Sequence, residues 1–388
     1  MLRFLTAGES HGPELTVIIE GVPAGYDISL EAINRDLARR QKGYGRGGRM
    51  AIERDEVRVV SGIRFGHTIG SPITLIVENR DFKNWEKRMS ADPRDRGEAK
   101  LVTRPRPGHA DLAGVLKYNL EDIRDVLERA SARETTMRVA LGSFARQLIT
   151  PFGISVLGYV ASIGNIEATT PTHASLEQLA LLSEESPVRV ADAAAEQAII
   201  AEIDACKREG DTLGGVVEVV AVGLPVGLGS HVQWDRKLDG RIAHALMSLQ
   251  AVKGVEFGKG FGAAAVRGSH LHDEISYDAV AKRFTRDSNN SGGTEGGIST
   301  GEPLRVRVAF KPLSTLMRPL RSADIKTKAE AVASIERSDV CAIPAAAVIA
   351  EAAVAFEIVN AFLEKFGGDS FAEIERNYSG YLQQIRDY

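Results

Sequence analysis

The chain has 388 residues, of which 44% are hydrophobic and 26% charged, ordinary values for a globular protein with a large core. Its 48 lysines and arginines stand against 52 aspartates and glutamates, which gives a formal net charge of −4 and a pI near 6.1. These values exclude disordered and fibrous classes and argue against a general nucleic-acid or membrane binder, so any anion site must be local.

Six segments have the composition of β-strands. The last of them alternates strictly, with apolar residues at every second position from Leu304 to Phe310. This period of two is typical of a half-buried antiparallel strand. The predicted strands are 15–22, 56–63, 72–79, 154–164, 214–224 and 303–310.

Helical periodicity lies between these strands. In the first helix, Ser29 is a candidate N-cap and Gly43 suits the position just past the end. The apolar segment from Pro344 carries Glu351 and Glu357, acids that are costly inside a membrane, so we expect a buried helix of a soluble protein. The predicted helices are 29–43, 118–129, 132–149, 175–184, 191–208, 345–366 and a segment from Phe371 onward.

Strands and helices are mixed without strict βαβ alternation, which favours the α+β class over a doubly wound sheet. Both halves contain strands followed by long helices, so an internal duplication is an open alternative. Long loops are rare in compact proteins unless they are functional. Four stretches, rich in Gly, Arg, His, Asp or Asn, fit neither the strand period nor the helix period and are predicted to be functional loops: 40–52, 80–114, 225–240 and 286–302.

Two cysteines, Cys206 and Cys341, are too few for a disulfide framework and form no CxxC pair. The N-terminus lacks the apolar run of a signal peptide. Both features predict a cytoplasmic protein.

The segment 35–49 is strongly basic. It holds six cations, one acid and the four glycines of "GYGRGG". Arginine binds carboxylate or phosphate in a bidentate way, and glycine lets the backbone approach a ligand. We therefore expect a small polyanion as the partner; a solvated basic face and an RNA-binding RGG segment are the alternatives.

Gly8–Gly12 fits the G-x-S-x-G pattern of a serine hydrolase, with Ser10 as nucleophile. That pattern requires a helix directly afterwards, whereas Pro13 and a β-branched run follow, so this interpretation is disfavoured. His11, next to Gly12 in this glycine-flanked stretch, is the more interesting residue as an exposed acid–base group.

His109 is a second glycine-flanked histidine, and Asp111 could orient its ring. A structural turn histidine is the alternative at this position. The glycine-rich loop 286–301 could offer backbone N–H groups to a phosphate or a ring system, but it has no Walker A or Rossmann pattern. His270 and His272 lack further placed ligands, so no metal site is predicted.

Eight stretches in this order resemble the chorismate synthase family over residues 1 to about 366. Ala130 departs from the family pattern, where a serine is expected. The stretches are "GESHG", "RRQKGYGRGGRM", "RPGHADL", "RASARET", "LQAVKGVEFG", "NNSGGTEGGISTGEP", "KPLST" and "ERSDVCAIP".

The resemblance implies the last step of the shikimate pathway. In that step 5-enolpyruvylshikimate 3-phosphate loses phosphate and a C6 proton by anti-1,4-elimination to give chorismate. Reduced FMN is required without net redox change, and its electrons come from NADPH or an external flavin reductase. The arginine cluster would then neutralise the carboxylates and phosphate of the substrate.

The resemblance also implies roles for single residues. His11 would protonate the departing phosphate, His109 would protonate the flavin near N1, and Asp339 would help to remove the substrate proton by way of flavin N5. Anion binding on the substrate or NADPH side falls to Arg40, Arg46 and Arg49. FMN contacts fall to Arg129, Ala130, Ser131, Gln250, Ala251, Gly296, Lys311, Pro312, Leu313, Ser314, Thr315 and Arg337.

The family fold implied is a β-α-β sandwich of antiparallel sheets around long central helices, with an internal pseudo-repeat. We expect one such domain over 1–388, commonly assembled as a homotetramer, with no nucleic-acid or membrane partner. An RNA-binding protein and a serine hydrolase remain the two competing interpretations.

Overall fold

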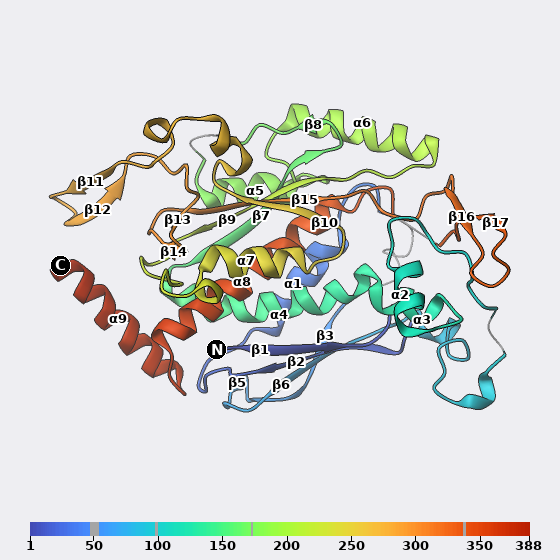
Figure 1. Ribbon diagram of the computed structural model, residues 1–388. Coiled ribbons are helices and arrows are strands. Elements are labelled where there is room, and N and C mark those ends of the chain that lie inside the picture. The colour runs from blue at the N-terminus through green and yellow to red at the C-terminus, as the bar shows by residue number, and fades with distance from the viewer. Residues whose placement is uncertain (47–53, 98–99, 172–173, 337–338) are drawn as a thin grey trace.

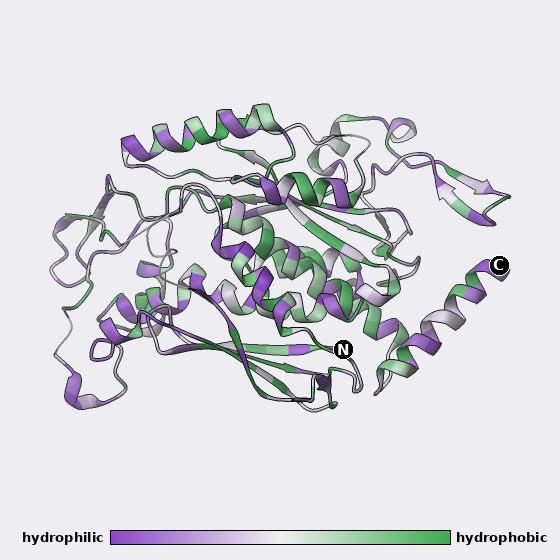
Figure 2. Cartoon of the chain, turned by 180° about the vertical axis from the view of Figure 1, so that it is seen from behind, coloured by the Kyte–Doolittle hydropathy of each residue, from purple (hydrophilic) through white to green (hydrophobic). Residues whose placement is uncertain are grey.

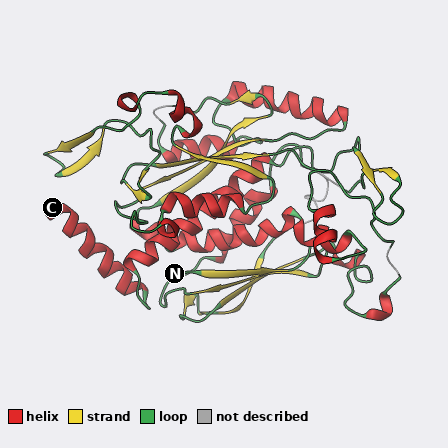
Figure 3. Cartoon of the chain, viewed as in Figure 1, coloured by secondary structure: helices red, strands yellow, loops and turns green. Residues whose placement is uncertain are grey.

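The computed structural model describes residues 1–46, 54–97, 100–171, 174–336 and 339–388 (Figure 1). Two larger antiparallel sheets lie on either side of a layer of helices, as the ribbon and the secondary-structure colouring show (Figures 1 and 3). Helices and antiparallel sheets occur in one body, which confirms the α+β class.

The first sheet has the strand order β1-β2-β6-β3. Its inner face is apolar because alternate residues point inward: Val17 and its cross-strand partner Leu75 are both fully buried. Ile18, on the other face, is exposed. The strands are β1 (Arg3–Ala7), β2 (Glu14–Glu20), β3 (Val57–Ser61) and β6 (Ile73–Glu78).

The second sheet has the order β10-β15-β9-β7-β8. In β15 the residues at even positions from Leu304 to Phe310 are buried, as the alternation predicts. The strands are β7 (Ser155–Ile163), β8 (Ile166–Glu167), β9 (Gly215–Val222), β10 (Val252–Phe257) and β15 (Leu304–Phe310).

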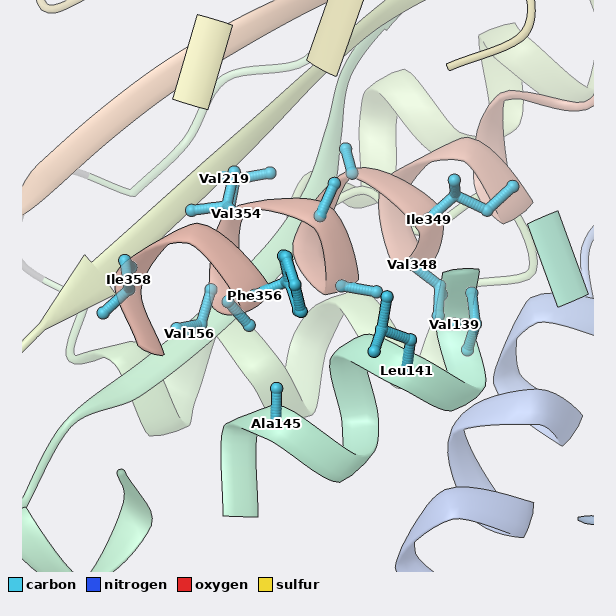
Figure 4. Close-up of a cluster of buried hydrophobic side chains, with 14 of the residues drawn as sticks. Val139, Leu141, Ala145, Val156, Val219, Val348, Ile349, Val354, Phe356 and Ile358 are labelled. Atoms are coloured by element: carbon cyan, nitrogen blue, oxygen red, sulfur yellow. The ribbon is translucent and has the colours of Figure 1, made fainter. Parts of the chain in front are cut away.

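Helix α8 (Ile343–Phe366) is the central element between the sheets (Figures 1 and 4). It packs on α4 (Thr135–Gln147), α1 (Leu30–Gln41) and α7 (Leu238–Met247), and on β7 and β9. Its length and composition would suit a membrane span, but 89% of its most apolar window is buried inside the molecule. The prediction of a buried core helix is confirmed.

The interior joins both sheets and the central helices in one hydrophobic cluster. Side chains from α4, α8, β7 and β9, among them Leu141, Phe356, Val156 and Val219, meet in it (Figure 4). The hydropathy colouring shows this apolar interior and the mixed polarity of the outer helices (Figure 2). The continuous core favours one domain; the single domain and the internal repeat stay predictions.

The remaining elements lie around this body. Helices α2 and α3 stand at one end of the sheets, and α9 extends from the other end (Figure 1). These helices are α2 (Asp111–Tyr118), α3 (Arg124–Ala130), α5 (Leu176–Glu185), α6 (Ala193–Glu209) and α9 (Phe371–Asp387). Short hairpins are β4 (Ile63–Arg64) with β5 (His67–Thr68), β11 (Ile275–Asp278) with β12 (Arg283–Arg286), β13 (Thr294–Glu295) with β14 (Ile298–Ser299), and β16 (Arg321–Ala323) with β17 (Glu330–Val332).

All six predicted strands are present, and Ser29 caps α1 as expected. The prediction of a helix over 118–129 is wrong: α2 ends at Tyr118 because Asn119 adopts a left-handed conformation, and a new helix begins at Arg124. The loop prediction for 225–240 is wrong at its end, where α7 starts at Leu238. The sequence patterns also missed β1 and β10.

Candidate active site

The candidate residues gather where α2 and α3 meet the ends of both sheets. The turn after β1 carries Ser10 and His11, the N-terminus of α2 carries His109, and the segment after β15 carries Lys311–Thr315. Hydrogen bonds between these segments, described below, bring together residues from four distant parts of the chain.

His109 is held by a buried carboxylate. Its Nδ1 lies 2.5 Å from Oδ1 of Asp111, so the predicted orientation of the ring by Asp111 is confirmed. Arg106 clamps the same carboxylate, donating from Nε to Oδ2 at 2.8 Å and from Nη2 to Oδ1 at 3.1 Å. The ring cannot turn without breaking this arrangement.

Burial alone would raise the pKa of Asp111, but the hydrogen bonds from His109 and Arg106 outweigh burial and hold this pKa well below its usual range. Asp111 is therefore an anion at neutral pH, and an ionised carboxylate only accepts hydrogen bonds. The Nδ1 atom of His109 must carry the proton in this contact.

The segment after β15 closes over the His109 loop. Lys311 Nζ and Ser314 Oγ donate to the carbonyl oxygen of Gly108 at 2.8 and 2.9 Å, and Arg106 Nη1 donates to Thr315 Oγ1 at 3.0 Å. Burial, and secondly the neighbouring charge of Lys253, lower the pKa of Lys311. Three residues expected at the cofactor, Lys311, Ser314 and Thr315, are thus placed beside the loop of the histidine expected to act with it.

His11 is held in the same manner. Its Nδ1 lies 2.9 and 3.1 Å from the two carboxylate oxygens of Glu128, and its backbone N–H donates to Oε2 at 2.8 Å. The imidazole also stacks on Trp85, with 3.9 Å between ring centroids. The expectation of an exposed histidine is wrong: only 14% of the side chain is exposed, because Trp85 and Glu128 cover it.

Glu128 is itself fixed by a cation. Arg124, one turn earlier in α3, donates from Nη1 to Oε1 at 3.1 Å and from Nη2 to Glu336 at 3.0 Å. Burial would raise the pKa of Glu128, but the hydrogen bond from His11 and the contacts with Arg124 lower it.

The end of α3 lies against the turn after β1. Arg129 donates from Nη1 to Gly8 O at 3.2 Å and from Nη2 to Thr6 O at 2.9 Å. Ser131 Oγ donates to Ser10 Oγ at 3.2 Å. Ser10 is 5% exposed and leads into a strand, so the geometry gives no support to a serine nucleophile elbow.

Gln250 and Ala251 join the two halves of the site. Gln250 Nε2 donates to Glu134, close after Ser131, and the backbone N–H of Lys311 donates to Ala251 O at 2.9 Å. Ala251 has a φ of 70°, a left-handed conformation that alanine rarely adopts. Such strain is often kept at binding turns.

Gly296 lies away from these residues. It forms the turn between β13 and β14, next to the start of β15, whereas Lys311 follows the end of that strand. Seven residues of strand separate these ends, about 20 Å. Within one chain the structure does not bring Gly296 to the site.

The arginines after α1 have different surroundings. Arg46 Nη1 lies 3.2 Å from Asp339 Oδ2, which places an expected anion-binding residue on the expected proton acceptor. Arg40 is buried and donates to Thr135 Oγ1 and Ala132 O, at 3.1 and 3.2 Å. Arg49 and Arg337 lie outside the described residues.

Sequence reasoning missed Glu128, Arg124 and Trp85. The first two lie on α3 at a spacing of four, which is a visible pairing signal, but nothing in the sequence links them to His11. Among the described residues, no group of three His, Cys, Asp or Glu side chains could hold a metal ion.

Fold and site together define the class: an α+β enzyme with two carboxylate-held histidines next to buried cations. Comparison with known proteins narrows this class to one family. The chorismate synthase family model matches residues 2–363. The chorismate synthase of Geobacter sulfurreducens is 58% identical over 394 residues, with 100% of both chains covered. That of Symbiobacterium thermophilum is 60% identical over 389 residues, with 99% of both covered. A solved chorismate synthase structure is 41% identical, with a TM-score of 0.81 over 100% of this chain and 99% of that one.

The chain belongs to the chorismate synthase family. It is an enzyme, a lyase of the shikimate pathway and of aromatic amino-acid biosynthesis. Membership of this family decides against the RNA-binding protein and the serine hydrolase.

Proposed function

We propose that this enzyme converts 5-enolpyruvylshikimate 3-phosphate into chorismate and phosphate by anti-1,4-elimination, with reduced FMN required and no net redox change. The observation that supports this most directly is the pair of histidines, each held by its Nδ1 on a buried, arginine-clamped carboxylate. An elimination that releases phosphate and a proton needs acid–base groups held in this way.

The residues around Gln250 fit a flavin. Its Oε1 atom is buried and accepts no hydrogen bond from the described residues, so an acceptor is available to a ligand donor. The strained Ala251 follows it and accepts a hydrogen bond from the backbone N–H of Lys311, while Gln250 itself donates to Glu134. We assign FMN contacts to 129–131, 250–251 and 311–315, and to Arg337 by resemblance. Reduced FMN would supply an electron-rich ring that compensates charge as the C–O bond breaks.

Arg46 binds an anionic group of the substrate in this proposal. Its guanidinium is only 13% exposed, so a carboxylate or phosphate that reaches it loses water and gains a strong, directional hydrogen bond. Arg40 acts indirectly in this proposal. It donates hydrogen bonds to the segment 132–135 and so holds this segment in place beside Ser131. Arg49 belongs to the same proposed set.

Three residues manage protons. His11 donates a proton to the departing phosphate, His109 keeps a proton on the flavin side of the pocket, and Asp339 finally accepts the proton from C6. Lys311 and Ser314 fix the His109 loop through Gly108, so His109 is positioned before any ligand binds.

The remaining proposals concern the setting of the enzyme. We propose a cytoplasmic homotetramer that uses flavin reduced externally or with NADPH. If Gly296 contacts FMN as the resemblance implies, it must do so from another copy of the chain, since its own site is about 20 Å away. A tetramer provides such copies.

An anaerobic assay tests the proposal. Purified protein is mixed with 5-enolpyruvylshikimate 3-phosphate, and chorismate absorbance is followed without flavin, with dithionite-reduced FMN, with oxidised FMN, and with oxidised FMN plus NADPH. We expect turnover with reduced FMN. Turnover without any flavin, or none from folded protein that binds reduced FMN, would overturn the proposed reaction. The NADPH arm decides the source of electrons.

A further inference from the structure

The two histidine sites are built alike although they come from unrelated segments. In each, Nδ1 contacts a carboxylate whose side chain is almost wholly buried, Glu128 or Asp111. In each, an arginine holds the same carboxylate: Arg124 donates to Glu128, and Arg106 donates to Asp111. Asp111 is two residues from His109, but Glu128 is 117 residues from His11.

The contact between His11 and Glu128 fixes the proton on the imidazole. Glu128 is an anion at neutral pH, because its pKa is lowered, and an anionic carboxylate can only accept. The Nδ1 atom must therefore be the donor at 2.9 Å. In the neutral ring, Nε2 is left without a hydrogen and is the nitrogen able to take up and pass on a proton.

Two further contacts fix the plane of the ring. Trp85 stacks on the imidazole with 30° between the planes, and its Nε1 donates to Asp81 at 3.2 Å. The backbone N–H of His11 donates to the same carboxylate as its ring. The charged groups described around His11 are Glu128 and Arg124 on α3, Glu336 before α8, and Arg88 and Asp81 in the loop that carries Trp85.

We infer that Glu128 is the positioning residue of His11: it keeps the imidazole in the Nδ1–H tautomer and presents Nε2 to the substrate. The inference rests on the proposed acid role of His11. Arg124 supports this arrangement. Its hydrogen bonds to Glu128 and Glu336 prevent the Glu128 carboxylate from turning away from His11. Trp85 restrains the imidazole by stacking on its face.

Glu128→Gln is the informative change, because it keeps the shape and removes the charge. The amide can donate to Nδ1 through its NH2 group, which favours the wrong tautomer. We expect kcat to fall about 10²-fold, within the range of a general acid, with KM changed less than about threefold. Glu121→Gln, at an exposed site where the described part of the chain gives it one ion pair, with Lys326, is the matched control and should keep wild-type kcat.

Nitrogen-15 NMR of histidine-labelled protein gives a readout that needs no turnover. In the wild type, the His11 signals should be those of the Nδ1–H tautomer, and in Glu128→Gln the Nε2–H form should appear. Wild-type kcat in Glu128→Gln, or an unchanged tautomer, would overturn the inference. Since the NMR result does not depend on the reaction, it separates failure of this inference from failure of the proposed function. Glu128→Asp, which keeps the charge, should retain the Nδ1–H tautomer and recover part of kcat.

Discussion

The guanidinium of Arg46 and the carboxylate of Asp339 meet at 3.2 Å, from opposite ends of the chain. The backbone supports the pair, since the N–H of Val340 donates to Gly45 O at 2.9 Å. An anionic ligand that reaches Arg46 must share it with Asp339. The pair therefore keeps the cation in position before binding and places a proton acceptor next to the bound anion.

The contact between Arg46 and Asp339 predicts the effect of replacing the guanidinium of Arg46 by a lysine ammonium. Arg46→Lys keeps the charge but loses bidentate geometry, and a charged hydrogen bond contributes about 1.5–3 kcal/mol, or roughly 10- to 150-fold in binding. We expect KM for the phosphorylated substrate to rise by about that factor, measured in steady-state assays with reduced FMN. Arg35→Lys, at an exposed position on α1 without a described partner, is the control. An unchanged KM in Arg46→Lys would exclude Arg46 from anion binding.

His109→Ala should separate binding from chemistry. The loop around Gly108 is held by Lys311 and Ser314, not by the imidazole, so the pocket should keep its shape. We expect kcat to fall about 10²- to 10⁴-fold, while FMN affinity, followed by flavin fluorescence, changes little. His270→Ala, at an exposed histidine, should match the wild type. Normal turnover in His109→Ala would remove the acid–base role of this residue.

The sequence predicts contacts well where the partners are close along the chain. The alternation in β15 gives its buried face directly, and Asp111 is only two residues from His109. Glu128 could not be found in this way, since 117 residues separate it from His11 and its position in α3 resembles ordinary surface pairing.

A physical reason also explains why the sequence pattern did not predict α7. Leu238, Ile242 and Leu246 recur at a spacing of four and are buried, so a signal exists, but Gly240 and the glycine-rich loop before it weaken the helical pattern. Gly296 shows a different limit. Family resemblance assigns a contact, but only the topology reveals that its own chain places it far from Lys311.

Glu351 predicts a pH-dependent contribution to stability. This buried carboxylate of α8 accepts from Arg39 at 2.8 and 2.9 Å and from Gly158 N at 2.9 Å, and it also pairs with Arg146. Burial would raise its pKa, but the two arginines lower it. Because the folded pKa is below the unfolded value of about 4.3, its stabilisation is present above that pH and lost as pH falls through the folded pKa.

The test is urea unfolding of Glu351→Gln. At pH 7 we expect the free energy of unfolding to fall by about 3–5 kcal/mol, because two partly buried arginines lose a buried carboxylate that both contact, and Asp36 is then the anion they share. The difference from wild type should shrink below about pH 4.3. Glu20→Gln, which breaks an exposed pair with Arg3, should cost at most about 1 kcal/mol. A pH-independent difference between Glu351→Gln and wild type would contradict this explanation.

Gly142 sets the distance between α4 and α8. A Cβ built at this position would lie 2.3 Å from the carbonyl oxygen of Ala352, too close for any side chain. Alanine is the better helix former by about 1 kcal/mol, so propensity and packing predict opposite signs for Gly142→Ala. We expect packing to dominate, since the obstacle is backbone of the central helix, and the free energy of unfolding to fall by about 1–3 kcal/mol.

Gly380→Ala is the matched control on α9, where a Cβ would meet nothing within 4 Å. Only the helix propensity acts there, so this variant should be more stable than wild type by about 0.5–1 kcal/mol. Urea unfolding at pH 7 compares the two. If Gly142→Ala were as stable as Gly380→Ala, α4 and α8 could move apart without loss of packing, and the close approach would not be a requirement of the central layer.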